Sequence, residues 1–396
     1  MGRSDSAACP GSRCRCRPLR PLICLITLPA ARAWWWEFGL SREVNLKAWL
    51  AYQQPANLSF TDSAEANGQT RKVPRERQLI RLDYQTKYEG KLPVILEAAY
   101  QGARCLEPGW LEEAITKPYG QERVVFAGSK HGKQKMISGK LEVFLSHLRE
   151  NTQSAWTYLQ DGFLFQQHPE LREACPVRPE LLRGEEVPDH FSLLPEELVP
   201  GDSYLLWGGK YSRSKLHVDP YNWTGTNLVL RGRKIVRLIP PGGHDHLIGA
   251  SRQNCGLPLD CVKYESKWDL FAHRIPKGLP VWEATLMPGE MLIIPSGWWH
   301  QAANVANETV ALASQLLASR SGSWSAVAEI LRWNTKAHPT WKWTGLPAPP
   351  ANGGHDLDDE DAERLFTDFV EAIPEEAFQF AAEEALDIAQ HLNREL

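Results

Sequence analysis

The sequence has little net charge, no closely spaced cysteine pairs after its first residues, and only a short apolar run near its start. Its 44 Lys and Arg nearly balance 48 Asp and Glu, leaving a net charge of −4, which argues against a strong, general nucleic-acid binder. Cys105, Cys175, Cys255 and Cys261 have no C-x-x-C spacing, so we expect neither a zinc ribbon nor a disulfide framework, but buried thiols in a reducing compartment. The apolar run at residues 22–29 is too short to span a bilayer, and no transmembrane segment is expected.

The remaining composition, 43% hydrophobic and 23% charged, is that of an ordinary soluble globular protein. Residues 1–33 differ, because they hold six arginines, one acidic residue and four of the eight cysteines. This segment matches a secretory signal or an organelle transit peptide; the alternative is an unstructured extension or a misassigned start codon. We exclude it from the fold and favour a nuclear or cytoplasmic localisation, with targeting as the alternative.

The strongest pattern lies in the middle of the chain, at the H-x-D triplet His217-Val218-Asp219. On a strand, side chains two residues apart project from one face, so this imidazole and this carboxylate can bind one metal ion. His300, far downstream, is the candidate for a third ligand. Two histidines and one carboxylate on one face of an iron leave the opposite face open, as in non-haem Fe(II) oxygenases. The triplet alone is a weak signal, since most such residues on strands are solvated or structural.

The neighbours of the triplet predict a β-rich domain. Alternating or apolar runs indicate strands at residues 202–207, 234–239, 291–294 and 309–317, separated by Pro- and Gly-rich turns. Further upstream, the sequence predicts strands at residues 92–96 and 124–127 and helices at residues 110–115 and 141–148. Residues 130–135 carry three lysines and a histidine around a glycine, which indicates a solvated hairpin turn or a contact for an acidic patch or a phosphate backbone.

Two sequence blocks together resemble the jumonji-C (JmjC) oxygenases. They are L-H-V-D-P…N-x-x-x-x-G-x-K, ending at Lys234, and P-G-E-x-x-x-x-P-x-G-W-W-H, ending at His300. The resemblance covers roughly residues 90–335 and is closest to the small JmjC protein hydroxylases, since no zinc cluster of a reader domain accompanies it. It implies a mainly β fold, a cupin or jelly-roll double-stranded β-helix with flanking helices and a C-terminal helical extension.

The resemblance also implies a chemistry that depends on Fe(II), 2-oxoglutarate as cosubstrate, and O₂. His217, Asp219 and His300 become the metal ligands and catalytic residues. Lys234 would bind the far carboxylate of 2-oxoglutarate, because a buried ammonium without a partner is costly and implies an anionic ligand. The alternative is an exposed Lys234 with Arg233 pointing inward.

Further cosubstrate contacts are implied residue by residue. Tyr158 and Ser214 match donors to the cosubstrate carboxylate, Asn227 matches an asparagine that lines the pocket, and Gln315 falls where relatives carry an asparagine. Ala313 is a departure, since it replaces a threonine of the lysyl-hydroxylase relatives. The detailed hydrogen bonding of the cosubstrate is therefore open.

The pattern predicts four regions. They are an extension at 1–33, an N-terminal α/β segment packing on the barrel at 34–200, the JmjC/cupin core at 201–320, and a helical region at 321–396. Residues 240–281 form a polar, Gly- and Pro-rich insertion, which we interpret as a substrate lid. Its histidines, His244, His246 and His273, are expected to be solvated rather than metal-bound.

Aromatic side chains near the triplet and near His300 are expected to shape the site. Of Trp298 and Trp299, one is expected in the core and the other on the cavity wall, while Trp223 should face the substrate. Two amphipathic helices near the C-terminus either dock on the chain's own sheet or pair two subunits as a homodimer.

The sequence thus predicts an oxygenase that hydroxylates a protein side chain of the Lys, Asn or Arg type and converts 2-oxoglutarate to succinate. The alternatives are an N-methyl demethylase of histones or other proteins, an RNA-nucleoside oxygenase, and a catalytically silent cupin scaffold. A protein or peptide is the expected partner, with RNA as the further class. Intact His217, Asp219, His300 and Lys234 argue against the scaffold.

Overall fold

The structure is a computed structural model of the chain. It describes residues 60–61, 70–100, 102–130, 133–162, 164–175, 177–183, 189–193, 203–219, 223–254 and 262–317, with isolated positions between 364 and 379. The N-terminal extension and, apart from those positions, the predicted C-terminal helices lie outside the described residues. Targeting and helix-mediated dimerisation therefore stay predictions. Among the described residues, no helix is long and apolar enough to cross a membrane.

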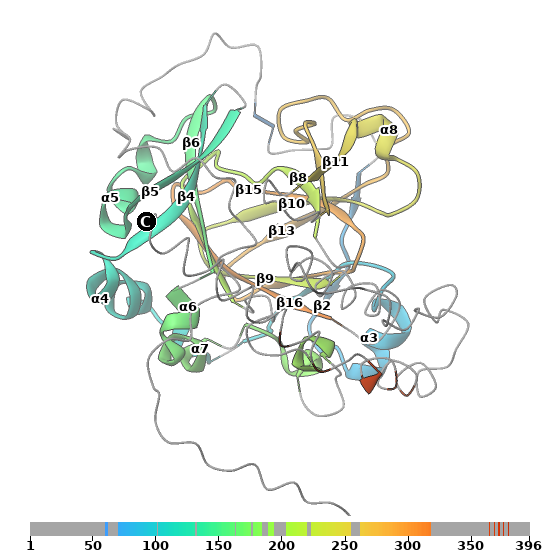
Figure 1. Cartoon of the computed structure of the whole chain (residues 1–396), viewed down its shortest axis with the longest axis horizontal. Coiled ribbons are helices and arrows are strands. Elements are labelled where there is room, and N and C mark those ends of the chain that lie inside the picture. Colours follow the sequence, from blue (N-terminus) through green and yellow to red (C-terminus); the bar gives the residue numbers. More distant parts are fainter. Residues whose placement is uncertain are drawn as a thin grey trace, which may run out of the picture.

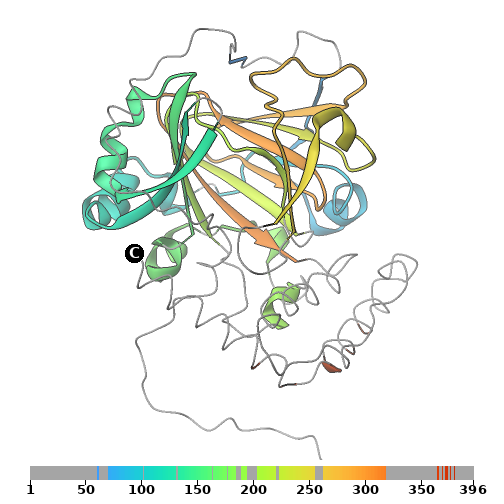
Figure 2. The same ribbon diagram turned by 45° about the horizontal axis from the view of Figure 1, so that its top comes forward.

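Two facing β-sheets dominate the described part of the chain, as Figures 1 and 2 show. The smaller sheet has the strand order β1-β13-β10-β15-β8-β12-β11. Its strands are β1 (Thr70–Lys72), β13 (Val281–Leu286), β10 (Lys234–Ile239), β15 (Trp299–Asn304), β8 (Leu216–Val218), β12 (Val262–Ser266) and β11 (Ala250–Asn254). The predicted strand at 234–239 is present as β10.

The larger sheet has the order β2-β3-β14-β9-β16-β7-β6-β4-β5. Its strands are β2 (Arg75–Glu76), β3 (Val94–Leu96), β14 (Met291–Ile294), β9 (Thr224–Arg231), β16 (Thr309–Leu316), β7 (Tyr204–Gly208), β6 (Ala155–Asp161), β4 (Arg123–Lys130) and β5 (Lys133–Lys140). The predicted strands therefore all appear, and β4 and β5 form the predicted hairpin around residues 130–135. A mainly β cupin fold is confirmed.

Short helices flank the sheets. They are α3 (Arg81–Lys87), a π-helical turn (Glu112–Thr116) that runs into α4 (Lys117–Tyr119), α5 (Leu141–Ser146), α6 (Leu164–Gln167), α7 (Pro169–Ala174) and α8 (Asp245–Ile248). Single 3-10 turns lie at Arg104–Leu106, Leu148–Glu150, Glu180–Leu182 and His190–Leu193. The predicted helix at 110–115 is thus present as the π-helical turn and α4, and that at 141–148 as α5 with its following 3-10 turn.

Alternation along each strand divides the apolar side chains between two cores. On β9, Val229 faces the smaller sheet and packs with Val236 and Leu238 of β10, while Leu228 faces outward. The outward core also receives side chains from the flanking helices, such as Phe144 of α5. The barrel interior is therefore closed by side chains from both sheets, and polar residues on its inner face must serve a site or find partners there.

The strands before and after residue 200 belong to the same larger sheet. β6, from the predicted N-terminal segment, pairs with β7 of the predicted core, as in Tyr158↔Gly208 and Asp161↔Leu205. The N-terminal segment therefore contributes strands to the barrel as well as helices packed on it. The boundary at 200 itself stays a prediction.

The insertion at 240–281 contains more regular structure than a lid loop. After α8, strands β11 and β12 form an antiparallel hairpin. β12 then pairs with β8, the strand of the H-x-D triplet, with Glu265 opposite His217. Part of the insertion thus widens the smaller sheet beside the triplet; that it covers the site as a substrate lid stays a prediction.

One cysteine prediction was wrong. Cys105 and Cys175 form a disulfide across a separation of 70 residues, with their Cα atoms 5.2 Å apart. Both side chains lie in the outward core, so the pair joins the 3-10 turn at Arg104–Leu106 to the end of α7. Spacing could not reveal this pair, because only the folded chain brings the two positions together.

Candidate metal and cosubstrate site

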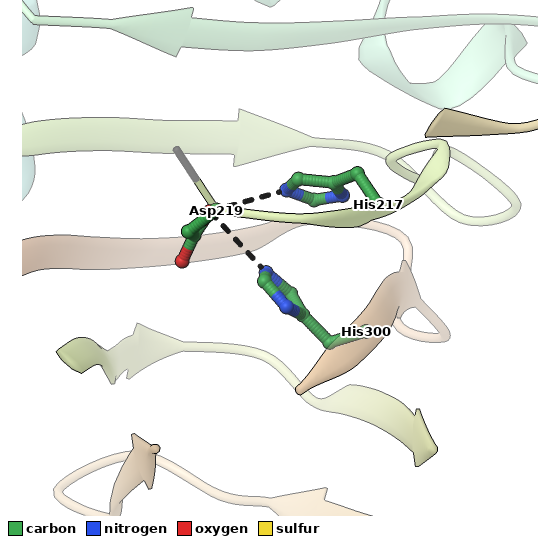
Figure 3. A group of neighbouring side chains, drawn as sticks. All are labelled: His217, Asp219 and His300. Atoms are coloured by element: carbon green, nitrogen blue, oxygen red, sulfur yellow. Dashed lines mark ion pairs between the residues drawn. The ribbon is translucent and has the colours of Figure 1, made fainter. Parts of the chain in front are cut away.

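The H-x-D triplet and His300 meet on the inner face of the smaller sheet (Figure 3). β15 pairs with β8 so that His300 lies directly opposite His217, and Asp219 follows β8. The Asp219 Oδ1 atom lies 3.4 Å from His217 Nε2 and 3.7 Å from His300 Nε2. One donor atom from each residue lies within 4.8 Å of the other two, and no other such group of His, Cys, Asp or Glu occurs among the described residues.

The two imidazoles are oriented by the backbone. The Nδ1 atom of His217 lies 2.8 Å from the carbonyl oxygen of Lys215, and that of His300 lies 3.1 Å from the carbonyl oxygen of Trp298. A carbonyl only accepts hydrogen bonds, so each Nδ1 must carry the proton. Each Nε2 then presents its lone pair toward Asp219, the tautomer that a metal ligand requires.

Burial and charge set the protonation of the three groups. Burial lowers the pKa of His300 to about 4, so this imidazole is neutral at physiological pH. Burial alone would raise the pKa of Asp219, but the neighbouring imidazoles of His300 and His217 and hydrogen bonds to the carboxylate hold it at about 2. Burial also lowers the pKa of His217, yet Asp219, and to a lesser degree Glu265, raise it overall. Asp219 therefore stays ionised at physiological pH, and its carboxylate attracts a cation.

Two residues position Asp219. The buried Trp223 donates a side-chain hydrogen bond to its carboxylate. Gly225, on β9, faces it without a side chain, and a Cβ atom there would lie 3.1 Å from Asp219 Oδ2. Trp223 was expected to face the substrate; it lines the cavity and also holds the candidate ligand.

Lys234 points into the barrel. Its side chain is 1% exposed, whereas Arg233 is exposed, so the alternative with an inward Arg233 is wrong. The Lys234 Nζ atom lies 3.2 Å from the hydroxyl oxygen of Tyr158, and no carboxylate in the described part of the chain forms an ion pair with it. Burial lowers the pKa of Lys234 to about 7 and raises that of Tyr158. An anion would restore the charge on this lysine.

The other predicted cosubstrate residues line the cavity that contains the three candidate metal ligands. Ser214, Asn227 and Gln315 face it together with Tyr158 and all three candidate ligands. Asn227 is 8% exposed, and its Oδ1 atom has no hydrogen-bond partner among the described residues, as expected of a group reserved for a ligand. Ser214 Oγ accepts a hydrogen bond from the backbone N–H of Ala302 at 3.0 Å.

One prediction about aromatic residues needs correction. Trp298 and Trp299 both pack in hydrophobic clusters, and neither lines the cavity. Trp299 also donates to Asp245 Oδ1 at 3.1 Å, which ties β15 to α8. The aromatic wall comes instead from Tyr158, Tyr204 and Trp223. The predicted solvated histidines of the insertion lie outside the metal group.

Sequence reasoning missed Arg178, which holds the end of β16 where Ser314 and Gln315 line the cavity. Its Nη2 atom donates to the carbonyl oxygen of Gln315 at 2.6 Å, and its Nε atom donates to Ser314 Oγ at 3.1 Å. Asp189 completes the contact through an ion pair with Nη1. No short motif marks these residues, since they lie more than a hundred positions from the strand that they hold.

Comparison with known proteins identifies the fold family. Residues 81–314, well over half of the chain, match the family described as the cupin-like domain. The chain belongs to the cupin-like domain family. Within this cupin-like domain, the matched range includes the triplet, His300 and Lys234, and its last residue is Ser314 on β16.

The cupin-like chain is similar to several JmjC proteins. The lysine-specific demethylase JMJ21 of Arabidopsis thaliana is 27% identical over 236 residues, which are 59% of this chain and 24% of that protein. The arginine-specific demethylase JMJ22 of the same plant is 27% identical over 273 residues, 67% of this chain and 49% of JMJ22. The bifunctional arginine demethylase and lysyl-hydroxylase psr-1 of Caenorhabditis elegans is 22% identical over 219 residues, 54% of this chain and 53% of psr-1.

These similarities confirm the predicted kinship with JmjC oxygenases. The chain spans from about a quarter to about half of the length of these curated relatives. Their names include both demethylase and hydroxylase activities, and the comparison does not separate the two for this chain.

The residues fit the group that the family implies. Two imidazole nitrogens and one carboxylate suit Fe(II), whereas thiolates would favour zinc. Both nitrogens are fixed in the ligating tautomer, and Asp219 keeps its charge. Lys234 adds a buried cation in the same interior, as an acidic cosubstrate needs.

Proposed function

We propose that this cupin-like protein is an Fe(II)- and 2-oxoglutarate-dependent oxygenase that hydroxylates a protein side chain of the Lys, Asn or Arg type. The supporting observation is that an oriented His-Asp-His group and an inward lysine share one barrel interior. The group can hold a metal by one face, and the lysine can neutralise a dicarboxylic cosubstrate. A scaffold would need neither feature.

Each residue has a defined part in this proposal. His217, Asp219 and His300 hold the metal through Nε2, Oδ1 and Nε2. The ammonium of Lys234 and the hydroxyl of Tyr158 bind the far carboxylate of 2-oxoglutarate. Bound Fe(II), with 2-oxoglutarate and O₂, supplies oxidative decarboxylation to succinate and CO₂ and transfer of one oxygen atom to a substrate C–H bond.

The protein surroundings support that chemistry. Val236, Ala302 and Leu206 line the cavity with apolar groups, which limit the water around the metal. Asn227, on β9, and Ser214, in the turn before β8, offer polar atoms to the cosubstrate. A buried, weakly solvated lysine binds an anion more strongly than an exposed one, because the interaction is screened less.

A second candidate function is N-methyl demethylation. It is favoured by the similarity to JMJ21 and JMJ22, whose names describe lysine- and arginine-specific demethylases. Hydroxylation of an N-methyl group gives a product that loses formaldehyde, so the same site residues serve both reactions.

Turnover assays test the class and separate the two reactions. The purified chain is incubated with Fe(II), 2-oxoglutarate and libraries of unmodified peptides, N-methylated peptides and RNA, and succinate and formaldehyde are measured. The hydroxylase predicts succinate with unmodified peptides and no formaldehyde. Formaldehyde with methylated peptides alone would support the demethylase. Succinate formation that His217→Ala leaves unchanged would contradict the proposal.

A further inference from the structure

A second cavity adjoins the candidate metal cavity at His217. It shares Tyr158, Gln160, Ser214 and His217 with the candidate metal cavity. The two are therefore neighbouring parts of one interior that opens toward the β4–β5 hairpin. The remaining lining residues come from this hairpin, from the turn before β8 and from β12: Ala127, Gln134, Lys135, Met136, Arg213, Lys215 and Glu265.

Among the described residues of that lining, Glu265 is the single acidic one. It lies directly opposite His217 on β12, and opposed residues of an antiparallel pair project from the same face. Its side chain is 4% exposed although it is a carboxylate. A buried carboxylate is costly unless a cation or several donors compensate it.

Lys215 supplies that cation in the free protein. Its Nζ atom lies 2.9 Å from Glu265 Oε2, and its side chain remains 36% exposed. The lysine approaches from the solvent side on a flexible four-carbon stem, and it can return to water at little cost. The carboxylate cannot follow, because it belongs to a buried strand position.

The other charged groups in the lining do not compete for this role. Arg213 is bound to Asp269 at 2.7 Å and is packed against the rings of Phe60 and Trp156. Lys135 lies on the exposed side of the hairpin. Arg213 is therefore committed to its own ion pair, while the Lys215–Glu265 pair is the exchangeable one.

We propose that Glu265 binds a cationic Lys or Arg side chain of the substrate. Lys215 forms an ion pair with the Glu265 carboxylate until the substrate displaces it. The exchange conserves charge, since one cation leaves for solvent as another arrives. Gln134 and Gln160 offer amide donors and acceptors to the substrate's peptide groups. This inference names the substrate class of the proposed oxygenase, and it rests on that proposed function.

The test measures binding, so that it does not depend on turnover. Short fluorescent peptides that differ at one central position, Lys, Arg, norleucine or Glu, are titrated against the full chain loaded with Mn(II) and 2-oxoglutarate. The variants are Lys215→Met and Glu265→Gln. Lys72→Met is the matched control, because Lys72 pairs with the 4% exposed Glu283 at 3.0 Å on a different strand and away from the cavity.

The unchanged protein is expected to prefer Lys and Arg peptides over norleucine and Glu peptides. Lys215→Met removes the internal competitor and should strengthen cationic binding about twofold to fivefold, the range for a half-exposed ion pair. Glu265→Gln should weaken it at least about tenfold and abolish the preference over norleucine. Lys72→Met should change neither.

Two results would overturn the proposal. One is a weaker affinity of Lys215→Met for cationic peptides together with a preference of the unchanged protein for Glu peptides, which would assign the cavity to an anionic group. The other is an unchanged preference in Glu265→Gln. If Glu265→Gln does not fold, Lys215→Met alone decides by the direction of its effect. A cationic preference without any succinate formation would support this cavity while contradicting the oxygenase.

Discussion

Lys234 and Tyr158 meet in the barrel interior from opposite sheets, with the ammonium nitrogen 3.2 Å from the phenol oxygen. Lys234 comes from β10 and Tyr158 from β6, 76 positions earlier in the chain. Packing alone does not explain this pair, because two apolar side chains would fill the same space without the desolvation cost of a buried ammonium. The pair therefore marks the place for an acidic ligand.

Replacement of this lysine should remove cosubstrate binding without removing the metal. We predict that Lys234→Met weakens 2-oxoglutarate binding at least about 30-fold, because loss of a buried charge partner costs roughly 2–5 kcal/mol. Calorimetry with Mn(II)-loaded protein measures both affinities. Arg233→Met, at the exposed neighbouring position, is the matched control. Equal 2-oxoglutarate affinities in Lys234→Met and in the unchanged protein would exclude the assigned role.

The same lysine predicts the pH dependence of cosubstrate binding. Burial lowers the pKa of Lys234 to about 7 in the free protein, and the anionic cosubstrate binds the protonated form. Above that pH, binding requires uptake of a proton, so the affinity should fall by up to tenfold per pH unit. Below it the affinity should level off. Calorimetry in buffers of different ionisation enthalpy should show proton uptake on the alkaline side, and a flat profile in Lys234→Arg; a flat profile in the unchanged protein would contradict this assignment.

Lys234→Met should also stabilise the ligand-free protein. A lowered lysine pKa means that folding disfavours the charged form, so this residue costs stability below its unfolded pKa of 10.5; the cost grows as the pH falls to about 7 and is constant below that. Its removal should raise the free energy of unfolding at neutral pH by about 1–3 kcal/mol. Denaturant titration without ligand measures the change. A loss of stability would mean that the ammonium has a compensating partner.

The absence of a side chain at Gly225 should be required for full metal affinity. A Cβ atom there would lie 3.1 Å from Asp219 Oδ2, closer than ordinary contact, so Gly225→Ala should displace the carboxylate. We predict a loss of about tenfold or more in Fe(II) affinity, the size found for groups that orient metal ligands. Gly139→Ala is the control, because its Cβ atom would meet Phe126 at an ordinary 3.5 Å. Equal metal affinities in the two variants would sink the assignment.

The folded core could be read from the sequence where local pattern and spacing sufficed. β10 and β14 follow from alternation and apolar runs bounded by turns. The approach of His300 to His217 and the inward orientation of Lys234 were both implied by the family resemblance of the two motif blocks. These features depend on residues close together or on a family arrangement.

Features that depend on contacts between positions far apart in the chain could not be predicted from the sequence. The Cys105–Cys175 bond and the contact of Arg178 with β16 join positions that no spacing rule relates. Residue type could not show whether Trp298 and Trp299 lie in the core or on the cavity wall, because large aromatic side chains occur in both places. The pairing of β12 with β8 was hidden because the insertion reads as a polar loop.

The disulfide should contribute measurably to stability. A cross-link that closes a 70-residue loop restricts the unfolded chain, and removal of such a bond typically costs about 2–4 kcal/mol. We expect the double variant Cys105→Ala with Cys175→Ala to lose that amount in denaturant titration. Reductant should destabilise the unchanged protein by a similar amount and leave the variant unaffected. Equal sensitivity of both proteins to reductant would show that the bond does not form.

The central claim is that His217, Asp219 and His300 hold one metal beside a 2-oxo acid. An anaerobic titration of the Fe(II)-loaded protein with 2-oxoglutarate, followed by visible charge-transfer absorption, tests it most directly. The account predicts a new absorption band that saturates at one equivalent of iron per chain and is absent in His300→Ala. Iron that binds without producing this band, or a band that survives in His300→Ala, would contradict it.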